Sequence, residues 1–239
     1  MRKPYEIVEN VFIIGGGGLT GAGDCLIYLI KTQEGLVLID AGLGEDTDQL
    51  ISNIKALGLA PSDLKALILT HCHIDHIGGA AVLKQKYNLE TYAHAFDVPA
   101  IEGEKLVMTG ATLYGVKYEP VKIDHVLTVE KGEEIVDFGN ISLVCMHIPG
   151  HTPGSICIYT DINGSIMGWI FMRVLFGQDV HGPLFDAFGS NAADFVKSLN
   201  RMIALDADIL CEGHFGIYQP AAEVKKYIKG YAQQFSRQL

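Results

Sequence analysis

The sequence predicts an α/β fold in which two mixed β-sheets pack against each other and helices cover their outer faces. Strand-like and helical segments alternate along the chain, so that a β-rich part and a helical part each occur twice. Histidine-containing motifs follow predicted strands in both parts, as in α/β proteins that place a site at strand ends. No low-complexity linker interrupts residues 1–239, so we expect a single domain of two similar halves that meet near residue 120.

The first half is predicted to begin with strands and to continue with helices. Residues 6–18 are predicted to form a strand that ends in glycines, and residues 24–42 two strands joined by the polar segment KTQEG. Residues 45–58 have acids in the first turn, apolar residues at helical spacing and a terminal glycine, which indicates an amphipathic helix. Residues 63–69 predict a buried strand, and residues 78–88 return to helical character.

The second half is predicted to return to strands after a weakly patterned middle segment. Residues 95–115 suggest one or two helices, although their apolar positions follow no clear period. The strand signals are short apolar runs, with a turn predicted at TDING. These runs lie at residues 122–129, 133–139, 141–148, 155–160, 164–172 and 207–214. Helices are predicted at residues 192–205 and 220–235, the second with a proline near its start.

The composition is that of an ordinary globular protein, with 49% hydrophobic and 19% charged residues. The net charge of −10 argues against nucleic acid as a partner, because binding to a phosphate backbone requires a basic surface. No apolar run follows the basic N-terminal residues, and no segment reaches the length of a membrane span, so we expect neither a signal peptide nor a membrane partner. Five scattered cysteines do not resemble a disulfide framework, which favours a reducing, cytoplasmic location.

The stretch THCHIDHIGG contains four potential metal ligands close together. His71, His73 and Asp75 share the parity of an extended backbone, and His76 can join them once the chain turns into a helix. Imidazole and carboxylate donors together are the usual ligands of zinc or non-haem iron. Four such donors in so short a stretch favour metal binding over a structural role. Cys72 is expected to point away from its neighbours as a buried thiol.

Two further histidines have the positions of distant ligands. His151 lies between two Pro-Gly turns in IPGHTPGS, and His214 ends a predicted strand in CEGH. His147 is predicted to be a strand residue, and His94 and His125 to be surface or hydrogen-bonded histidines. Since His151 and His214 belong to the second half, the ligands would meet in a cleft between the two halves.

The motifs HCHIDH, GHTPGS and EGH resemble, in their order and spacing, those of the metallo-β-lactamase superfamily. The resemblance covers nearly the whole chain, from the LIDAG strand, in which Asp40 matches a structural aspartate of the family, to the last histidine. It implies an αββα sandwich with a centre for two metal ions, zinc in the first place and iron or manganese as alternatives. By position, one metal would be held by His71, His73 and His151, and the other by Asp75, His76 and His214.

The sequence departs from the family pattern at the aspartate that normally bridges the two metals. Turn spacing places Trp169 at that position, whereas the following VLF places Arg173 there, and we favour Arg173. Without a bridging carboxylate the second metal should bind more weakly, because two nearby dications repel each other. Asp179, a few residues downstream, is a candidate substitute. The sequence leaves open whether the position was altered by engineering.

The resemblance and the ligand types predict a metal-dependent hydrolase. Metal-bound water with a pKa near 7 would supply hydroxide for attack on a carbonyl, and Asp75 would orient it and carry a proton to the leaving group. A small carboxyl ester, thioester or lactone is the expected substrate. Tyr218, His181 and Phe215 are candidates for lining the pocket, because they lie near the ligands in the sequence.

Two other functions compete with this prediction. The missing bridging aspartate favours a metal-binding domain with little catalysis, whose activity Arg173→Asp or Trp169→Asp would restore. Phosphodiester cleavage is the other alternative, although the sequence offers no recognisable phosphate-binding motif, because the glycines at residues 15–18 lack the following lysine. The oligomeric state is left open.

Overall fold

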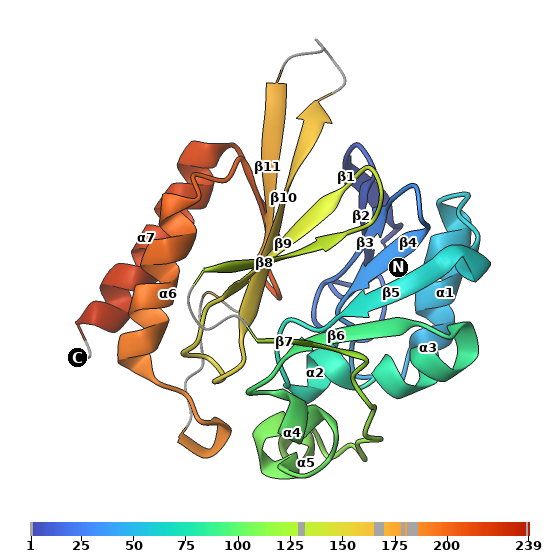
Figure 1. The fold of residues 1–239 in the computed structure, drawn as a ribbon, viewed down its shortest axis with the longest axis horizontal. Coiled ribbons are helices and arrows are strands. Elements are labelled where there is room, and N and C mark those ends of the chain that lie inside the picture. Colours follow the sequence, from blue (N-terminus) through green and yellow to red (C-terminus); the bar gives the residue numbers. More distant parts are fainter. Residues whose placement is uncertain (1, 129–131, 165–169, 178–179, 181–185, 238) are drawn as a thin grey trace.

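The protein is described here by a computed structural model that covers residues 2–128, 132–164, 170–177, 180, 186–237 and 239. It has the predicted αββα architecture, in which two mixed sheets face each other and helices lie outside them (Figure 1). Among these residues, no helix combines the length and apolar character needed to cross a membrane. The division into two similar halves stays a prediction.

The first sheet has seven strands in sequence order. Its first four strands form antiparallel hairpins, and the remaining three join in parallel, so that their carboxyl ends lie at one edge. The strands are β1 (Tyr5–Val8), β2 (Val11–Gly15), β3 (Ile27–Lys31), β4 (Leu36–Ile39), β5 (Leu64–Ile68), β6 (Glu90–His94) and β7 (His125–Leu127).

The second sheet has six strands in the order β13-β12-β11-β10-β9-β8. All neighbours are antiparallel except β11 and β12, which run parallel. The strands are β8 (Glu133–Asp137), β9 (Ser142–His147), β10 (Ile156–Gly164), β11 (Ile170–Phe176), β12 (Ile209–Cys211) and β13 (Ile217–Tyr218).

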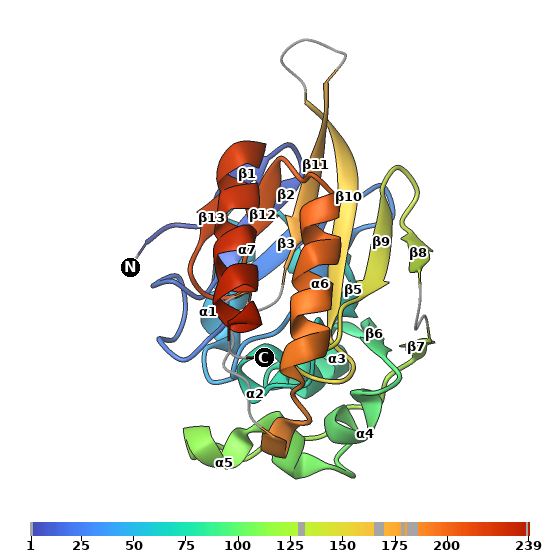
Figure 2. The same ribbon diagram turned by 90° about the vertical axis from the view of Figure 1, so that its left-hand side faces the viewer.

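The helices form the two outer layers and the connections near the site. In Figures 1 and 2, α6 and α7 lie side by side over the second sheet, and α1 and α3 lie outside the first. The α-helices are α1 (Thr47–Ala56), α2 (Ile74–Ile77), α3 (Ala80–Tyr87), α4 (Val98–Ile101), α5 (Ala111–Tyr114), α6 (Ala192–Ala204) and α7 (Ala221–Ser236). Three short 3₁₀ helices are η1 (Pro61–Asp63), η2 (Leu106–Thr109) and η3 (Asp186–Phe188).

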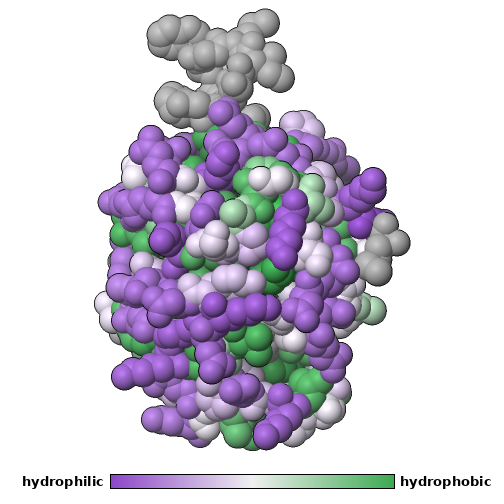
Figure 3. Space-filling view, turned by 90° about the vertical axis from the view of Figure 1, so that its right-hand side faces the viewer, coloured by the Kyte–Doolittle hydropathy of each residue, from purple (hydrophilic) through white to green (hydrophobic). Residues whose placement is uncertain are grey.

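Strand β3 packs against a hydrophobic layer on each of its two faces. Its side chains alternate between faces, as in any strand buried on both sides. Ile27 and Leu29 pack into the cluster under α1 and α3, while Tyr28 and Ile30 pack between the two sheets. A third cluster fills the space between the second sheet and helices α6 and α7. The face in Figure 3 is mainly hydrophilic with scattered hydrophobic patches, as expected when the apolar residues are used in these layers.

Two local predictions are wrong. The single strand predicted at residues 6–18 is a hairpin of β1 and β2, because Asn10 adopts a φ of 64°, a left-handed conformation that asparagine tolerates in turns. The turn predicted at TDING, residues 160–164, is instead part of β10, which pairs continuously with β11 from Ile158 to Gly164. Cross-strand pairing outweighs the local turn preference of these residues.

Candidate metal centre

Strand β5 and helix α2 place the HCHIDH segment at the edge where the parallel strands end. After β5 the chain bends at His71 and enters α2, for which His73, in an extended conformation, is the N-cap residue. Asp75 and His76 then lie in the first turn of the helix. All four side chains are at most 8% exposed, and His76 is fully buried.

His71, His73 and His151 form a first group of donors. One nitrogen atom from each lies within 4.8 Å of the other two. His71 Nε2 lies 3.1 Å from His73 Nδ1, and the ring of His151 is 4.8 Å and 4.5 Å from the rings of His71 and His73. Three buried imidazoles with converging nitrogens match the ligand set of a catalytic zinc ion with one open position.

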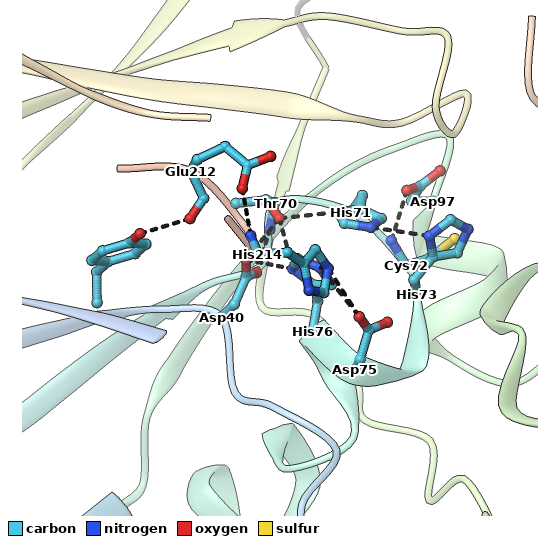
Figure 4. A network of polar contacts seen from close by, with 11 residues as sticks. Asp40, Thr70, His71, Cys72, His73, Asp75, His76, Asp97, Glu212 and His214 are labelled. Carbon is cyan, nitrogen blue, oxygen red and sulfur yellow. Dashed lines mark hydrogen bonds and ion pairs between the residues drawn. The ribbon is translucent and has the colours of Figure 1, made fainter. Parts of the chain in front are cut away.

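Asp75, His76 and His214 form a second group. The Nε2 atoms of the two histidines are 3.4 Å apart, and each faces Asp75 Oδ2, at 3.7 Å from His76 and 3.2 Å from His214. The rings of His71 and His76 are 4.0 Å apart, so the two groups adjoin each other, as Figure 4 shows. The structure thus brings together all six residues that the sequence predicted as ligands, from segments far apart in the chain.

Asp40 fixes the orientation of His76. Its Oδ2 lies 2.8 Å from His76 Nδ1, and its carboxylate also accepts hydrogen bonds from the N–H and hydroxyl of Thr70, both at 2.8 Å. When Nδ1–H donates to Asp40, the Nε2 of His76 is available to a metal, which is the usual arrangement behind a metal-binding histidine. Asp40 adopts a φ of 63°, a left-handed conformation in which aspartate is found more often than most residues.

The electrostatics of this group favour a positive charge. Burial alone would lower the pKa of His76, but the carboxylates of Asp40 and Asp75 beside it hold this pKa well above its ordinary value. The negatively charged groups that favour a proton on His76 would also stabilise a metal ion. Binding of that ion would displace the proton. Cys25, Asp40 and His76 also lie close enough to ligate an ion. Because burial raises the pKa of Cys25 to about 12, this thiol stays protonated near neutral pH, so we assign His76 to the group with Asp75.

Asp97, which the sequence did not single out, connects the two loops of the first group. Its carboxylate accepts hydrogen bonds from the N–H of Cys72 at 2.9 Å, the hydroxyl of Thr152 at 2.6 Å and the N–H of Gly154 at 2.7 Å. The side chain is buried, and burial raises the pKa of its carboxyl although these hydrogen bonds oppose the shift. Its position directly before α4 suggests an N-cap, but it makes no cap hydrogen bond.

Glu212 was also missed, although EGH was recognised as a motif. This buried carboxylate accepts the N–H groups of His214 and Phe215, both at 2.6 Å, and Tyr28 donates its hydroxyl to the Glu212 backbone carbonyl. The turn that carries His214 is therefore held by hydrogen bonds from inside the protein (Figure 4). The sequence shows the EGH motif, but it does not show that the Glu212 side chain turns back towards the N–H groups of the residues that follow it.

Arg173 does not lie beside the ligands, which contradicts the favoured assignment of the bridging position. It stands in the middle of β11, where its guanidinium contacts Asp161 on β10 at 2.7 Å and 2.9 Å and lies over the ring of Tyr159. Strand pairing decides this: Arg173 opposite Asp161 is the register of β10 and β11. The other two candidates, Trp169 and Asp179, fall outside the described residues.

The remaining histidines largely follow the sequence prediction. His147 is the last residue of β9, where its Nε2 contacts the carbonyl of Pro153 and its ring stacks on His94. His125 is a surface residue paired with Glu90. Of the proposed pocket residues, Phe215 lines a cavity next to His214, Tyr218 stacks on Tyr227, and His181 lies outside the described residues.

Comparison with known proteins gives a family match. Residues 20–167 match the family profile described as the metallo-beta-lactamase superfamily. The class B3 di-zinc metallo-beta-lactamase LRA-12 from an Alaskan soil metagenome has a similar structure, with a TM-score of 0.78 and 25% sequence identity. That similarity covers 99% of this chain and 92% of the other.

Curated relatives have hydrolase names. The hydroxyacylglutathione hydrolase of Aeromonas hydrophila is 29% identical over 187 residues, or 78% of this chain. An N-acyl homoserine lactonase of a Bacillus species is 24% identical over 215 residues, covering 78% of this chain and 79% of that protein. The chain spans 59% of the length of the hydroxyacylglutathione hydrolases that it matches.

Proposed function

The chain belongs to the metallo-beta-lactamase superfamily, and on that premise we propose that it is a metal-dependent hydrolase of small carboxyl esters, thioesters or lactones. Two similar proteins support the substrate class by their names, one a hydrolase of a glutathione thioester and the other a lactonase. The observation that carries the proposal is the pair of adjoining donor groups, in which six buried or half-buried side chains converge from both halves of the chain.

The two donor groups would hold two ions. His71, His73 and His151 would ligate the first and Asp75, His76 and His214 the second, with zinc as the proposed metal and iron or manganese as alternatives. When bound, such ions supply a Lewis acid and a water molecule with a pKa lowered to about 7. The di-zinc description of LRA-12 supports the choice of zinc.

Asp75 is the proposed catalytic carboxylate. It is buried, and its Oδ2 lies between His76 and His214, where it can orient a water molecule and accept its proton. Its backbone carbonyl accepts the N–H of Cys25, which holds the start of α2 against the first sheet. The Asp75 carboxylate is therefore held in place while it accepts the proton of the water molecule and passes it to the leaving group.

Asp179 is our proposal for the bridging carboxylate. Arg173 is engaged with Asp161, and β11 ends at Phe176 beside the segment that leads to His214, since Gly177 donates its N–H to the Cys211 carbonyl. Asp179 is the first acidic residue in the sequence after that strand end. A carboxylate at this position would supply the bridging ligand whose absence is the reason for expecting a metal-binding domain with little catalysis.

The proposal is tested by metal analysis together with a substrate panel. Protein loaded with zinc should contain about two ions per chain and hydrolyse a thioester or lactone, and chelation should abolish turnover until zinc is returned. The panel should include a phosphodiester, because faster cleavage of that compound would favour the alternative function. Two bound ions with no turnover of any carbonyl substrate would contradict the proposal and support a binding role.

A cytoplasmic location, a small-molecule substrate and the absence of nucleic-acid or membrane partners complete the proposal. All five cysteines are free thiols and are buried, which suits a reducing compartment. The net charge of −10 disfavours polyanionic partners.

A further inference from the structure

A small cavity adjoins the second donor group. Its volume is about 140 Å³, and His214 forms part of its wall. The rest of the lining comes from the strand β2, the loop that follows it, the turn after His214 and the first residues of the chain. Because a proposed metal ligand borders the cavity, a molecule whose reacting carbonyl lies at the metal centre could extend one end into it.

Part of the lining of this cavity is apolar. Ile13, Leu19 and Leu26 are each at most 6% exposed and offer only hydrocarbon groups. The wall at Gly16 has no room for a side chain, since a Cβ there would lie 2.2 Å from the Cys25 carbonyl oxygen and the φ is +68°. The part of the cavity beside these three residues therefore suits a short apolar chain, because a polar group buried against them would lose its hydrogen bonds to water.

Arg2 gives the lining a positive charge. Apart from His214 it is the one ionisable basic residue among the described residues that line the cavity, and no acidic residue is among them. Its backbone N–H donates to the Gly18 carbonyl at 3.1 Å, which attaches the start of the chain to the loop that forms the wall. In a protein with a net charge of −10, a cation at this position is a local exception that can select an anionic group.

We propose that this cavity is the acyl subsite of the hydrolase, and that it prefers a short acyl chain ending in a carboxylate, which pairs with Arg2. The inference rests on the hydrolase function proposed above. The acyl carbonyl lies at the metal centre, the methylene groups occupy the apolar part beside Leu19 and Leu26, and the terminal carboxylate reaches Arg2.

The test compares two thioesters that share one leaving thiol, succinyl and butyryl, with the zinc-loaded protein. The succinyl thioester should have a kcat/KM about twofold to fivefold higher, as expected for one partly exposed ion pair. Arg2→Ala should remove this preference and Arg2→Glu should reverse it, mainly through KM. The neighbouring Lys3→Ala, which changes the same charge outside the cavity lining, is the matched control and should keep the preference.

A binding measurement separates this inference from the proposed function. Free succinate should bind the zinc-loaded protein more tightly than butyrate, and Arg2→Ala should abolish the difference, whether or not any thioester is hydrolysed. Carboxylate binding to the metal alone would be unchanged by Arg2→Ala. Equal binding of the two acids, or a succinate preference that survives Arg2→Ala, would overturn the proposed subsite. Absence of turnover with Arg2-dependent binding would overturn only the hydrolase.

Discussion

At the scale of single residues, Asp97 accepts hydrogen bonds from both segments that carry the first donor group. The N–H of Cys72 lies between His71 and His73 in the chain, and Thr152 directly follows His151. One carboxylate thus joins the two loops, in addition to the hydrogen bond from the Ile156 N–H to the Thr70 carbonyl. Loss of such a hydrogen-bond partner behind the ligands usually lowers the metal affinity by about tenfold to hundredfold.

Asp97→Asn should therefore weaken the first metal site and the fold together. The amide keeps the size of the carboxylate, but its NH₂ group must face at least one of the present donors and leaves that donor without an acceptor. We expect a loss of about 1–3 kcal/mol in the free energy of unfolding, and a lower zinc affinity in competition with a chelator. Asp48→Asn, at a side chain that is 97% exposed, is the control and should change neither quantity. Equal results for the two variants would contradict the role of Asp97.

The difference between predicted and missed residues has a physical basis. The six ligands could be predicted because their residue types and short spacings already suggest a metal site. Asp97 could not, because its partners lie 25, 55 and 57 residues away and depend on how the loops meet. Arg173 was misplaced for the same reason, since its ion pair with Asp161 is a consequence of strand register.

At the scale of elements, β11 places Arg173 away from the candidate metal centre. The strand turns Arg173 towards Asp161 and ends at Phe176, next to the strand that leads to His214. In the sequence, turn spacing favoured Trp169 for the bridging position, and the following VLF favoured Arg173. The favoured assignment failed because the short VLF match does not reveal that Arg173 pairs with Asp161 across β10 and β11.

Variants of Asp179 and Arg173 test this assignment. Asp179→Asn should reduce the zinc content towards one ion per chain, because the second ion loses a negatively charged partner. Arg173→Asp should leave the metal content unchanged and lower stability, because it places a second carboxylate beside Asp161. Metal analysis after dialysis and urea unfolding measure the two effects. A gain of metal or activity in Arg173→Asp would contradict the placement of Arg173.

The loop that carries His151 depends on helix α6. Ser198 donates its hydroxyl to the Pro149 carbonyl at 2.7 Å, and Arg201 donates to the His147 carbonyl. Gly150 has a φ of +135°, and a Cβ there would lie 2.3 Å from the backbone of Phe195. The approach of loop and helix therefore requires a glycine at this position.

Gly150→Ala should destabilise the protein by more than 1 kcal/mol, because the backbone conformation is strained and the helix cannot move away at low cost. It should also lower zinc affinity, since His151 is the next residue. Gly230→Ala is the matched control: it lies in α7, and a Cβ there meets nothing within 4 Å. That variant should stabilise the protein by about 0.5–1 kcal/mol. Urea unfolding of both variants measures their free energies of unfolding. A similar change in the two variants would contradict the prediction.

At the scale of the whole molecule, the candidate metal centre is built from both sheets. His71, His73, Asp75 and His76 follow a strand of the first sheet, whereas His151 and His214 follow strands of the second. The sheets also share an apolar layer, in which Tyr28 packs against Phe176. Metal binding should therefore stabilise the packing of one sheet on the other, because an unfolded chain does not bring these ligands together.

Removal of metal should lower the melting temperature of the entire domain in one transition. Zinc at a hundredfold excess over its Kd contributes about 2.7 kcal/mol, which for a chain of this size corresponds to a shift of about 5–10 °C. His214→Ala should lose part of this shift, because it removes a ligand supplied by the second sheet, whereas His125→Ala, at a surface histidine, should retain it. Calorimetry with zinc and with chelator measures the shift for each variant. If chelation leaves the melting temperature unchanged, the six side chains do not hold an ion between the sheets; if it melts one sheet before the other, the centre belongs to one half alone.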